Sequence, residues 1–171
     1  MQPEPRSPYA LAKLIGEEYL QIFTRCYGIE AVALRYFNVF GPRQNPDSPY
    51  SGVISVFADR IGRGEGVTVY GDGEQTRDFV YVADVVRANI LAMGAELSAP
   101  SALFNIATGR QTSLLGLLDA LEEIHGRQAE RVFAPERDGD VRHSCADVAR
   151  ACAELGYETQ TRMEEGLSRI V

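Results

Sequence analysis

The chain has 171 residues, of which 45% are hydrophobic and 24% are charged, a balance typical of one soluble globular domain with a substantial core. Acidic residues outnumber basic ones by 24 to 17, and the formal net charge of −7 argues against nucleic acid or an anionic membrane as a partner. No apolar run approaches the ~20 residues of a membrane span, and no signal peptide precedes Ser7, so we expect a cytoplasmic protein.

The cysteines and histidines indicate neither a disulfide framework nor a metal centre. Cys26, Cys145 and Cys152 are odd in number and lack the spacing of a metal site, so we expect buried free thiols. His125 and His143 are isolated, and we expect structural or surface roles for both. The sequence therefore predicts no metal site.

The first element that the pattern predicts is a helix over residues 8–27. Ser7 can act as its N-cap, and Pro8 suits the first helical position, where no amide hydrogen is needed. The run that follows contains no further proline, and Gly28 stands where the helix would end.

Tyr9 and Lys13 lie four residues apart on this helix and therefore share one face. A phenol ordinarily titrates near ~10, and a lysine beside it favours the phenolate and lowers its pKa. Tyr9 could then act as a base near neutral pH. Taken alone, the same spacing also fits a surface tyrosine beside a solvated lysine, so the pair indicates catalysis only together with the rest of the chain.

A strand and a long loop are predicted next. Residues 30–37 are nearly continuously apolar, which fits a parallel strand covered on both faces. Residues 38–52 are rich in Gly, Pro, Asn, Asp and Ser and are predicted to form a loop. A loop of this length inside a compact domain is usually functional.

Helices and strands alternate through the rest of the chain. The expected order is a helix over 53–63, a strand over 67–70, a turn over 71–74, a strand over 77–82, a helix over 84–93, a strand over 103–107, a helix capped by Thr112 or Ser113, a weak strand over 131–134, a loop over 137–140, and helices over 147–155 and 163–170. This alternation indicates an α/β architecture, and no repeat or linker divides the chain. None of the later glycines follows a strand and opens a helix, so no phosphate-binding fingerprint is predicted.

Five stretches of the chain occur in a characteristic order. They are SPYALAK (7–13), LRYFNVFGPRQNPDSPYSGVI (34–54), VYGDGEQTRDFVYVADVVRA (69–88), FNIATG (104–109) and RDGDVRHSCAD (137–147). Read together, they resemble the C-terminal half of extended short-chain dehydrogenase/reductase enzymes. The resemblance is strongest to nucleotide-sugar 4-epimerases of the UDP-glucose 4-epimerase type, and it covers nearly the whole chain.

This resemblance implies the C-terminal portion of a Rossmann-type, NAD-binding parallel sheet together with a small α/β substrate-binding domain. The segments of the two interleave, so residues 1–171 are expected to form a single truncated domain of the NAD-dependent epimerase/dehydratase family. In that family the glycine-rich NAD loop, the acidic ribose ligand and a catalytic Ser or Thr all precede the reactive helix. The resemblance therefore implies that the N-terminal βαβ cofactor half is absent.

The resemblance also implies roles for residues near the cofactor, which would be NAD. Tyr9 matches the catalytic tyrosine, and Lys13 matches the lysine that binds the nicotinamide ribose and lowers the pKa of that tyrosine. Phe37 matches a residue that lines the nicotinamide. In the implied mechanism Tyr9 takes the proton of the sugar 4-hydroxyl, the C4 hydride passes to NAD, and the 4-keto sugar turns over before the hydride returns.

A second group of residues is implied to bind the substrate, a UDP-sugar. Asn38 matches an asparagine that donates to the diphosphate, and Phe79 matches an aromatic residue near the nucleoside. Arg77 and Arg137 match two diphosphate arginines, whose planar forks suit phosphate oxygens. Asp140 matches an acidic residue at the nucleotide ribose. The local sequence by itself favours surface ion pairs between each arginine and the aspartate that follows it.

Other interpretations of the sequence stay open. The chain could belong to a nucleotide-sugar dehydratase or decarboxylase of the same family, or act as a non-catalytic sugar-nucleotide-binding or interaction fragment. We expect the chain alone to be inactive and to hold NAD weakly. Because an apolar strand edge and a helix face would lie uncovered, we expect a homo-oligomer or a complementary N-terminal half as partner. The family commonly dimerises through a four-helix contact that would use the first helix.

Overall fold

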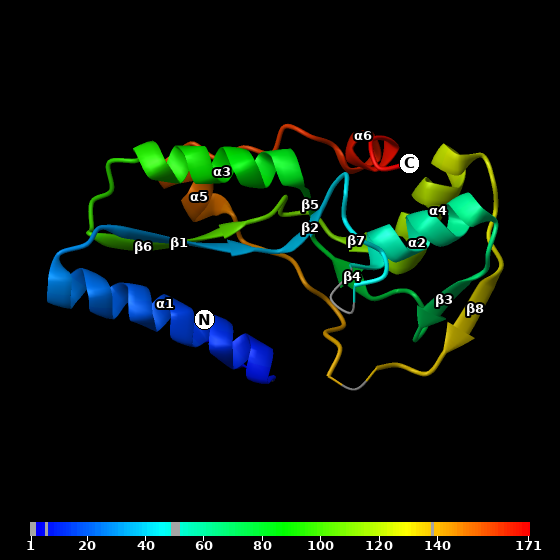
Figure 1. Ribbon diagram of the computed structural model, residues 1–171, viewed down its shortest axis with the longest axis horizontal. Coiled ribbons are helices and arrows are strands. Elements are labelled where there is room, and N and C mark those ends of the chain that lie inside the picture. Colours follow the sequence, from blue (N-terminus) through cyan, green and yellow to red (C-terminus); the bar gives the residue numbers. More distant parts are fainter. Residues whose placement is uncertain (1–2, 6, 49–51, 138) are drawn as a thin grey trace.

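The computed structural model describes residues 3–5, 7–48, 52–137 and 139–171 of the chain (Figure 1). Its elements in chain order are α1 (Pro8–Tyr27), β1 (Ala31–Tyr36), β2 (Asn38–Phe40), α2 (Val53–Arg63), β3 (Val67–Tyr70), β4 (Thr76–Arg77), β5 (Phe79–Tyr81), α3 (Val82–Gly94), β6 (Ser101–Ile106), β7 (Thr112–Ser113), α4 (Leu114–His125), β8 (Arg131–Ala134), α5 (Ala149–Leu155) and α6 (Met163–Ser168).

Both ends of α1 form as the sequence predicts. Ser7 Oγ accepts a hydrogen bond from the Ala10 amide at 3.1 Å. Gly28 adopts the left-handed conformation with φ of 67° and donates its amide to the Thr24 carbonyl. A glycine takes this conformation without a Cβ clash, which is why the helix ends there.

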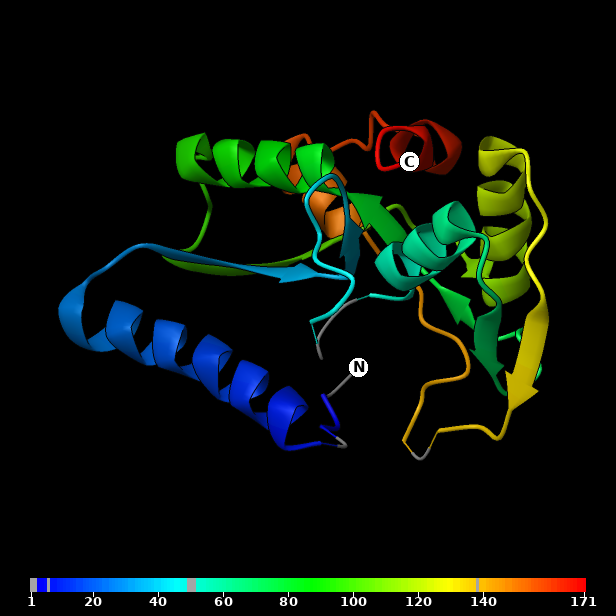
Figure 2. The same cartoon turned by 45° about the vertical axis from the view of Figure 1, so that its right-hand side comes forward.

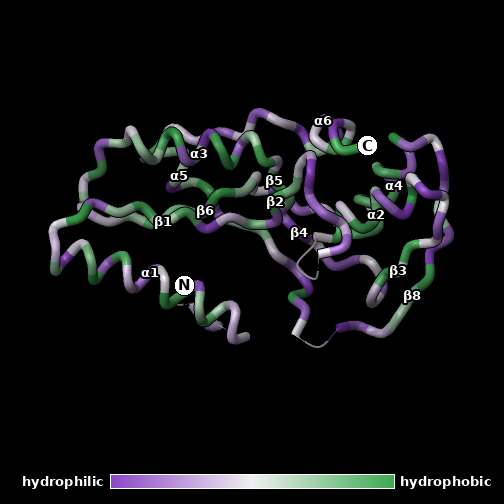
Figure 3. The backbone as a smooth tube through the Cα atoms, in the orientation of Figure 1, coloured by the Kyte–Doolittle hydropathy of each residue, from purple (hydrophilic) through white to green (hydrophobic). Residues whose placement is uncertain are grey.

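β1 and β6 form a parallel pair between two layers of helices. Ala31 lies opposite Ser101, and Tyr36 lies opposite Ile106. α1 lies on one side of this pair, whereas α3 and α5 lie on the other (Figure 1, Figure 2). β1 is hydrophobic along most of its length (Figure 3), as a strand covered on both faces requires. The expected parallel strand is confirmed.

Two core clusters hold the elements together. One packs α3 and α5 against β6 and contains Val80, Val85, Ala88, Phe104, Ile106, Ala151, Leu155 and Tyr157. The other lies where β3 pairs in parallel with β8 and α2 packs against α4, and its members include Phe40, Phe57, Ile61, Leu117, Leu118 and Leu121. The fold is therefore α/β with parallel strands, as predicted.

β2 and β5 join these two parts of the molecule. They pair in parallel, with Asn38 opposite Phe79. The prediction that residues 38–52 form a loop was wrong for the first three of them, residues 38–40. The strand depends on a partner far along the chain, which the local composition does not reveal.

Two short strands replace the strand predicted over 77–82. β4 pairs antiparallel with β7, whereas β5 pairs with β2, so the chain changes partner at Asp78. Val82 already opens α3, so Asp84 does not cap this helix as expected. The buried Asp84 carboxylate instead accepts the Gln160 amide at 3.0 Å.

The three cysteines are free, but the expectation that they are buried was wrong, because all three are exposed. Cys26 lies in the last turn of α1, and Cys152 lies on the outer side of α5. Local desolvation, together with the Asp78 carboxylate, raises the pKa of the Cys145 thiol. Within the described ranges no three His, Cys, Asp or Glu side chains group to hold a metal, and no helix combines the length and hydropathy of a membrane span.

Candidate active site

Two cavities meet at Asn38, near the carboxyl end of β1. The first, which we call the α1 cavity, has a volume of about 1130 Å³ and lies between α1 and β1. The second, which we call the arginine cavity, has a volume of about 280 Å³ and lies beside α2 and β3. Open α/β sheets bind their ligands outside the carboxyl ends of the strands. The arginine cavity lies there, and the α1 cavity runs along β1 from Val32 and reaches that end at Asn38.

α1 brings Tyr9 and Lys13 together in the α1 cavity. Lys13 Nζ lies 5.4 Å from the centroid of the Tyr9 ring. Both side chains line the cavity together with Phe37 and Asn38. Tyr9 is 66% exposed, so a ligand in the cavity can reach its hydroxyl group. The contact expected from the helical spacing is present, and the catalytic roles of the two residues stay predictions.

Hydrogen bonds to the main chain fix Phe37 and Asn38 at the end of β1. The Phe37 amide donates to the Ile106 carbonyl at 3.1 Å, and the Asn38 amide donates to the Asp78 carbonyl at 3.1 Å. Asn38 Nδ2 donates to the same Asp78 carbonyl at 3.2 Å. Because a side-chain amide carries two hydrogens, the second can be donated to a ligand.

Arg77 is held by three acceptors at the arginine cavity. Its Nη1 donates to the Thr76 carbonyl at 2.8 Å and to the Val141 carbonyl at 2.6 Å. Its Nη2 forms an ion pair with the Asp140 carboxylate. The alternative surface pair with Asp78 does not form, because the Asp78 carboxylate is buried among other donors.

Arg137 stacks on the Tyr70 ring, with its guanidinium carbon 3.8 Å from the ring centroid. Both residues line the arginine cavity together with Arg77 and Asp140. Asp138, the partner that the local sequence favours for Arg137, lies outside the described residues. The fold therefore brings to one cavity two guanidinium groups that lie far apart in the sequence.

Phe79 lies apart from the other predicted site residues. It is 6% exposed, packs in a core cluster with Phe40 and Tyr81, and lines neither the α1 cavity nor the arginine cavity. Its predicted contact with a nucleoside therefore gains no support from the geometry and stays a prediction.

Tyr70 and Gln75 line the arginine cavity, and the sequence analysis missed both. Gln75 Nε2 donates to the Tyr70 carbonyl at 2.6 Å, which links the end of β3 to the turn that follows. An aromatic residue at the carboxyl end of a strand, directly before Gly71, is a signal that could have identified Tyr70. Nothing local to Gln75 identifies it.

A buried carboxylate fixes the backbone beside the site. Asp78 is 0% exposed and accepts hydrogen bonds from the Thr108 amide at 2.8 Å, the Thr108 hydroxyl at 2.6 Å, the Gly109 amide at 2.9 Å and the Ala146 amide at 3.2 Å. These bonds tie the start of β5 to the turn after β6 and to the segment before α5. Asp78 thereby fixes the position of its neighbour Arg77.

The fold and the site together define a class of protein. A partial Rossmann-type sheet with a Tyr–Lys pair on the adjoining helix is the arrangement of the short-chain dehydrogenase/reductase class. A sequence model of the NAD dependent epimerase/dehydratase family matches residues 1–107, and the chain belongs to this family.

Known proteins of this family resemble the chain along nearly all its length. UDP-glucose 4-epimerase of Mycolicibacterium smegmatis is 37% identical over 171 residues, which are 100% of this chain and 54% of that protein. The structure of UDP-glucose 4-epimerase from Thermotoga maritima with UDP-glucose is 48% identical, has a TM-score of 0.92, and is matched over 97% of this chain and 52% of that one. The Thermus thermophilus UDP-glucose 4-epimerase complex with NAD is 36% identical, with a TM-score of 0.89 over 98% of this chain and 53% of that one. The chain thus spans about half the length of these relatives.

Proposed function

We propose that this chain supplies the Tyr–Lys pair and the sugar-nucleotide site of a UDP-hexose 4-epimerase that uses NAD. The observation that carries the proposal is the position of Asn38 on both cavities. A diphosphate between the two arginines would meet Asn38, and a sugar beyond it would extend toward Tyr9. The likeness to a UDP-glucose 4-epimerase solved with UDP-glucose supports this substrate class.

The charge of the arginine cavity supports a diphosphate ligand. The chain as a whole has a formal net charge of −7, whereas two guanidinium groups and the single Asp140 carboxylate leave this cavity with an excess of positive charge. The Arg137 guanidinium, stacked on Tyr70, offers a planar fork that can bind two phosphate oxygens. Arg77 already donates to Thr76, Val141 and Asp140, which leaves its Nε hydrogen and one Nη2 hydrogen for a phosphate oxygen. Asp140, which pairs with Arg77, offers an acceptor for a ribose hydroxyl.

Tyr9 and Lys13 handle the proton of the sugar 4-hydroxyl in this proposal. Tyr9 Oη accepts the proton, and the Lys13 ammonium, 5.4 Å from the ring centroid, stabilises the negative charge of the phenolate. The same phenol returns the proton to the 4-oxygen at the end of the cycle, so the pair leaves each turnover in the state in which it began.

The residues present fit the nicotinamide end of NAD. The Lys13 ammonium group can donate to ribose hydroxyls, and the Phe37 ring can pack against a flat heterocycle. Both residues line the α1 cavity together with Tyr9. NAD, when bound, supplies the acceptor for the hydride of sugar C4 and the donor that returns it. The described part of the chain shows no strand that passes through a glycine-rich turn into a helix, so we assign the rest of the cofactor to the complementary half.

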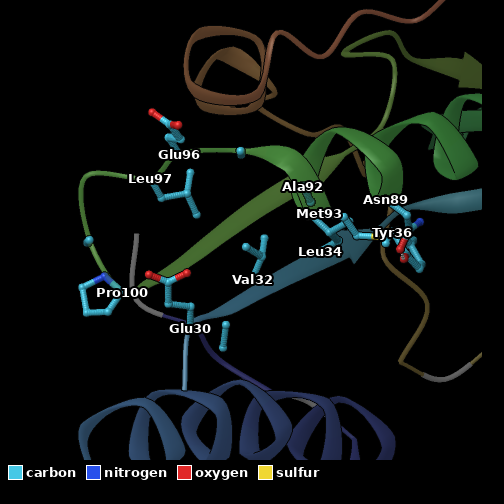
Figure 4. Close-up of a pocket in the computed structure, with 13 residues that line it drawn as sticks. Glu30, Val32, Leu34, Tyr36, Asn89, Ala92, Met93, Glu96, Leu97 and Pro100 are labelled. Carbon is cyan, nitrogen blue, oxygen red and sulfur yellow. Dashed lines mark hydrogen bonds between the residues drawn. The ribbon is translucent and has the colours of Figure 1, made fainter. Parts of the chain in front are cut away.

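The outer edge of β1 is the surface that we assign to this complementary half. β1 pairs with β6 along one edge, and no described strand pairs with the other edge. Beside that free edge a cavity of about 600 Å³ lies between β1 and α3, with Val32 and Leu34 on one wall and Met93 on the other (Figure 4). An unpaired edge beside a groove that has Val32, Leu34 and Met93 on its walls fits an incoming strand that is followed by a helix.

Replacing Met93 with glutamate is expected to weaken association with the complementary half by at least ~10-fold, because a carboxylate would be buried there without a partner. Met93 is 88% exposed in the chain alone, so its replacement leaves the fold intact. Sedimentation velocity of the chain mixed with the N-terminal half of the Thermotoga maritima relative measures the association.

The matched control for this experiment is Val132→Glu, because Val132 is 50% exposed on β8, away from β1. Equal association of Met93→Glu and the unaltered chain would contradict the assignment of the groove. Association of the chain with itself that Met93→Glu abolishes would assign the groove to a second copy instead.

UDP-glucose is expected to bind this chain without the complementary half, since the arginine cavity lies wholly within it. Arg137→Ala is expected to weaken this binding roughly 10- to 100-fold, the loss of a charge-assisted hydrogen bond of about 1.5–3 kcal/mol. Arg137→Lys keeps the charge but loses the planar fork, so its affinity for UDP-glucose should lie between those of the unaltered chain and Arg137→Ala. Titration calorimetry measures all three affinities.

Arg63→Ala serves as the control for the calorimetry, because Arg63 is exposed on α2 and pairs with Asp59 at 3.0 Å away from the site. Its affinity for UDP-glucose should equal that of the unaltered chain. An unaltered chain that does not bind UDP-glucose would refute the proposed site. Tighter binding of dTDP-glucose than of UDP-glucose would redirect the proposal from a UDP-sugar to a dTDP-sugar as the ligand.

A further inference from the structure

A two-point ion pair joins α1 to β1. Arg35 Nε donates to Glu17 Oε1 at 2.5 Å, and Arg35 Nη2 donates to Glu17 Oε2 at 2.5 Å. The Glu17 side chain is 16% exposed and the Arg35 side chain 36%, so solvent screens the pair only in part. The hydrogen bond to Glu17 raises the pKa of Arg35 despite its partial burial.

Beyond its packing on β1 and β6, few buried side chains hold α1 in place. Thr24 is the buried residue of this helix, and it lies near the C-terminal end, far from Tyr9. Apolar side chains near the N-terminal end, including Leu11 and Ile15, are exposed. In the ranges that the structure describes, the Glu17–Arg35 pair provides the side-chain hydrogen bonds between α1 and β1.

The helix residue of this pair, Glu17, lies on the face of α1 that carries Tyr9 and Lys13. Tyr9, Lys13 and Glu17 follow one another at intervals of four residues, so they lie along one face of the helix. One interval corresponds to a rise of about 6 Å along the helix axis. Glu17 and Arg35 line the α1 cavity together with Tyr9 and Lys13.

Arg35, the strand residue of this pair, lies close in the chain to Phe37 and Asn38, which are predicted to contact the cofactor and the substrate. Arg35 precedes Phe37 and Asn38 by two and three residues in an extended stretch whose main chain is bonded to β6 and to Asp78. A two-point contact fixes both the rotation and the axial position of a helix, which a single hydrogen bond would not.

From this geometry we infer that Glu17 and Arg35 are positioning residues, whose paired carboxylate and guanidinium set the placement of Tyr9 and Lys13 relative to Asn38. Neither side chain needs to touch the substrate for this role. The inference rests on the proposed function for its consequence in catalysis. A displacement of about 1 Å at reacting groups can cost on the order of 10²-fold in rate, so a loosened α1 should lower kcat.

The test uses Arg35→Lys, Glu17→Gln and the double variant in the complex of this chain with the complementary half. We expect kcat to fall roughly 10- to 100-fold while KM for UDP-glucose stays nearly constant, because the arginine cavity is untouched. The double variant should lose no more than the more damaging single variant, because both changes remove the same contact. Glu18→Gln, exposed on the neighbouring position of α1, is the control and should leave kcat unchanged.

Hydrogen exchange on the chain alone gives a readout that does not depend on turnover. Residues 9–13 should exchange faster in Arg35→Lys and Glu17→Gln than in Glu18→Gln, whereas UDP-glucose affinity should stay the same in all three. Arg35→Lys is the milder change, so it covers the case in which Glu17→Gln fails to fold. Unchanged kcat and unchanged exchange in both variants would overturn the positioning role. Failure of the unaltered chain to bind UDP-glucose would instead count against the proposed function.

Discussion

Replacing Tyr9 with phenylalanine is expected to lower the rate of UDP-glucose epimerisation by about 10²- to 10⁴-fold, the usual cost of removing a general acid–base group. The change removes the hydroxyl that we propose as the proton acceptor and keeps the ring beside Lys13. Because Tyr9 is largely exposed, the substitution should leave the stability of the chain unchanged. Turnover at saturating UDP-glucose, in the complex with the complementary half, measures the effect.

The matched control is Tyr19→Phe, because Tyr19 is also an exposed tyrosine on the same helix and lines neither cavity. Its turnover should equal that of the unaltered complex. UDP-glucose affinity should be the same for both variants, because the arginine cavity is intact. A Tyr9→Phe complex that epimerises UDP-glucose at the unaltered rate would contradict the proposed role of Tyr9 as the proton acceptor.

Replacing Asp78 with asparagine is expected to destabilise the fold by about 3 kcal/mol, because amide hydrogens would face buried N–H donors that then lack an acceptor. The two carboxylate oxygens each accept bonds, one from Thr108 and the other from Gly109 and Ala146. An asparagine has a single carbonyl oxygen and can satisfy only one side. Urea unfolding followed by circular dichroism measures the loss.

Asp59→Asn is the control for the unfolding experiment, since Asp59 forms a solvent-exposed ion pair with Arg63. Such a pair contributes only ~0–1 kcal/mol, so the control should unfold close to the midpoint of the unaltered chain. An Asp78→Asn chain as stable as the control would show that the buried bonds described here contribute little.

Elements with local end signals could be predicted from the sequence. The ends of α1 follow from Ser7, Pro8 and Gly28, and α2 ends before Gly64, which is also left-handed. The strand predicted over 77–82 failed for a different reason. Its interruption depends on donors at Thr108 and Ala146, which approach only when the chain has folded.

The same difference between local signals and contacts of distant segments decided which site contacts could be predicted from the sequence. The pairing of Tyr9 with Lys13 follows from helical spacing alone, and the structure shows it. The pairing of Arg77 with Asp140 joins distant segments, and only the resemblance placed both at the substrate. Tyr70 was missed because its role depends on Arg137, which reaches its ring from a different loop.

Efforts to redesign sugar selectivity would do well to leave Asn38 as it is. Its main-chain and side-chain nitrogens converge on one carbonyl, so a larger or differently shaped replacement would disturb the junction of β2 with β5. Because Asn38 lines both cavities, we expect a substitution there to change UDP-sugar affinity and turnover together, so the two phenotypes could not be selected independently. Mutant libraries are better drawn from the walls on either side of this residue, where each trait can be screened by itself.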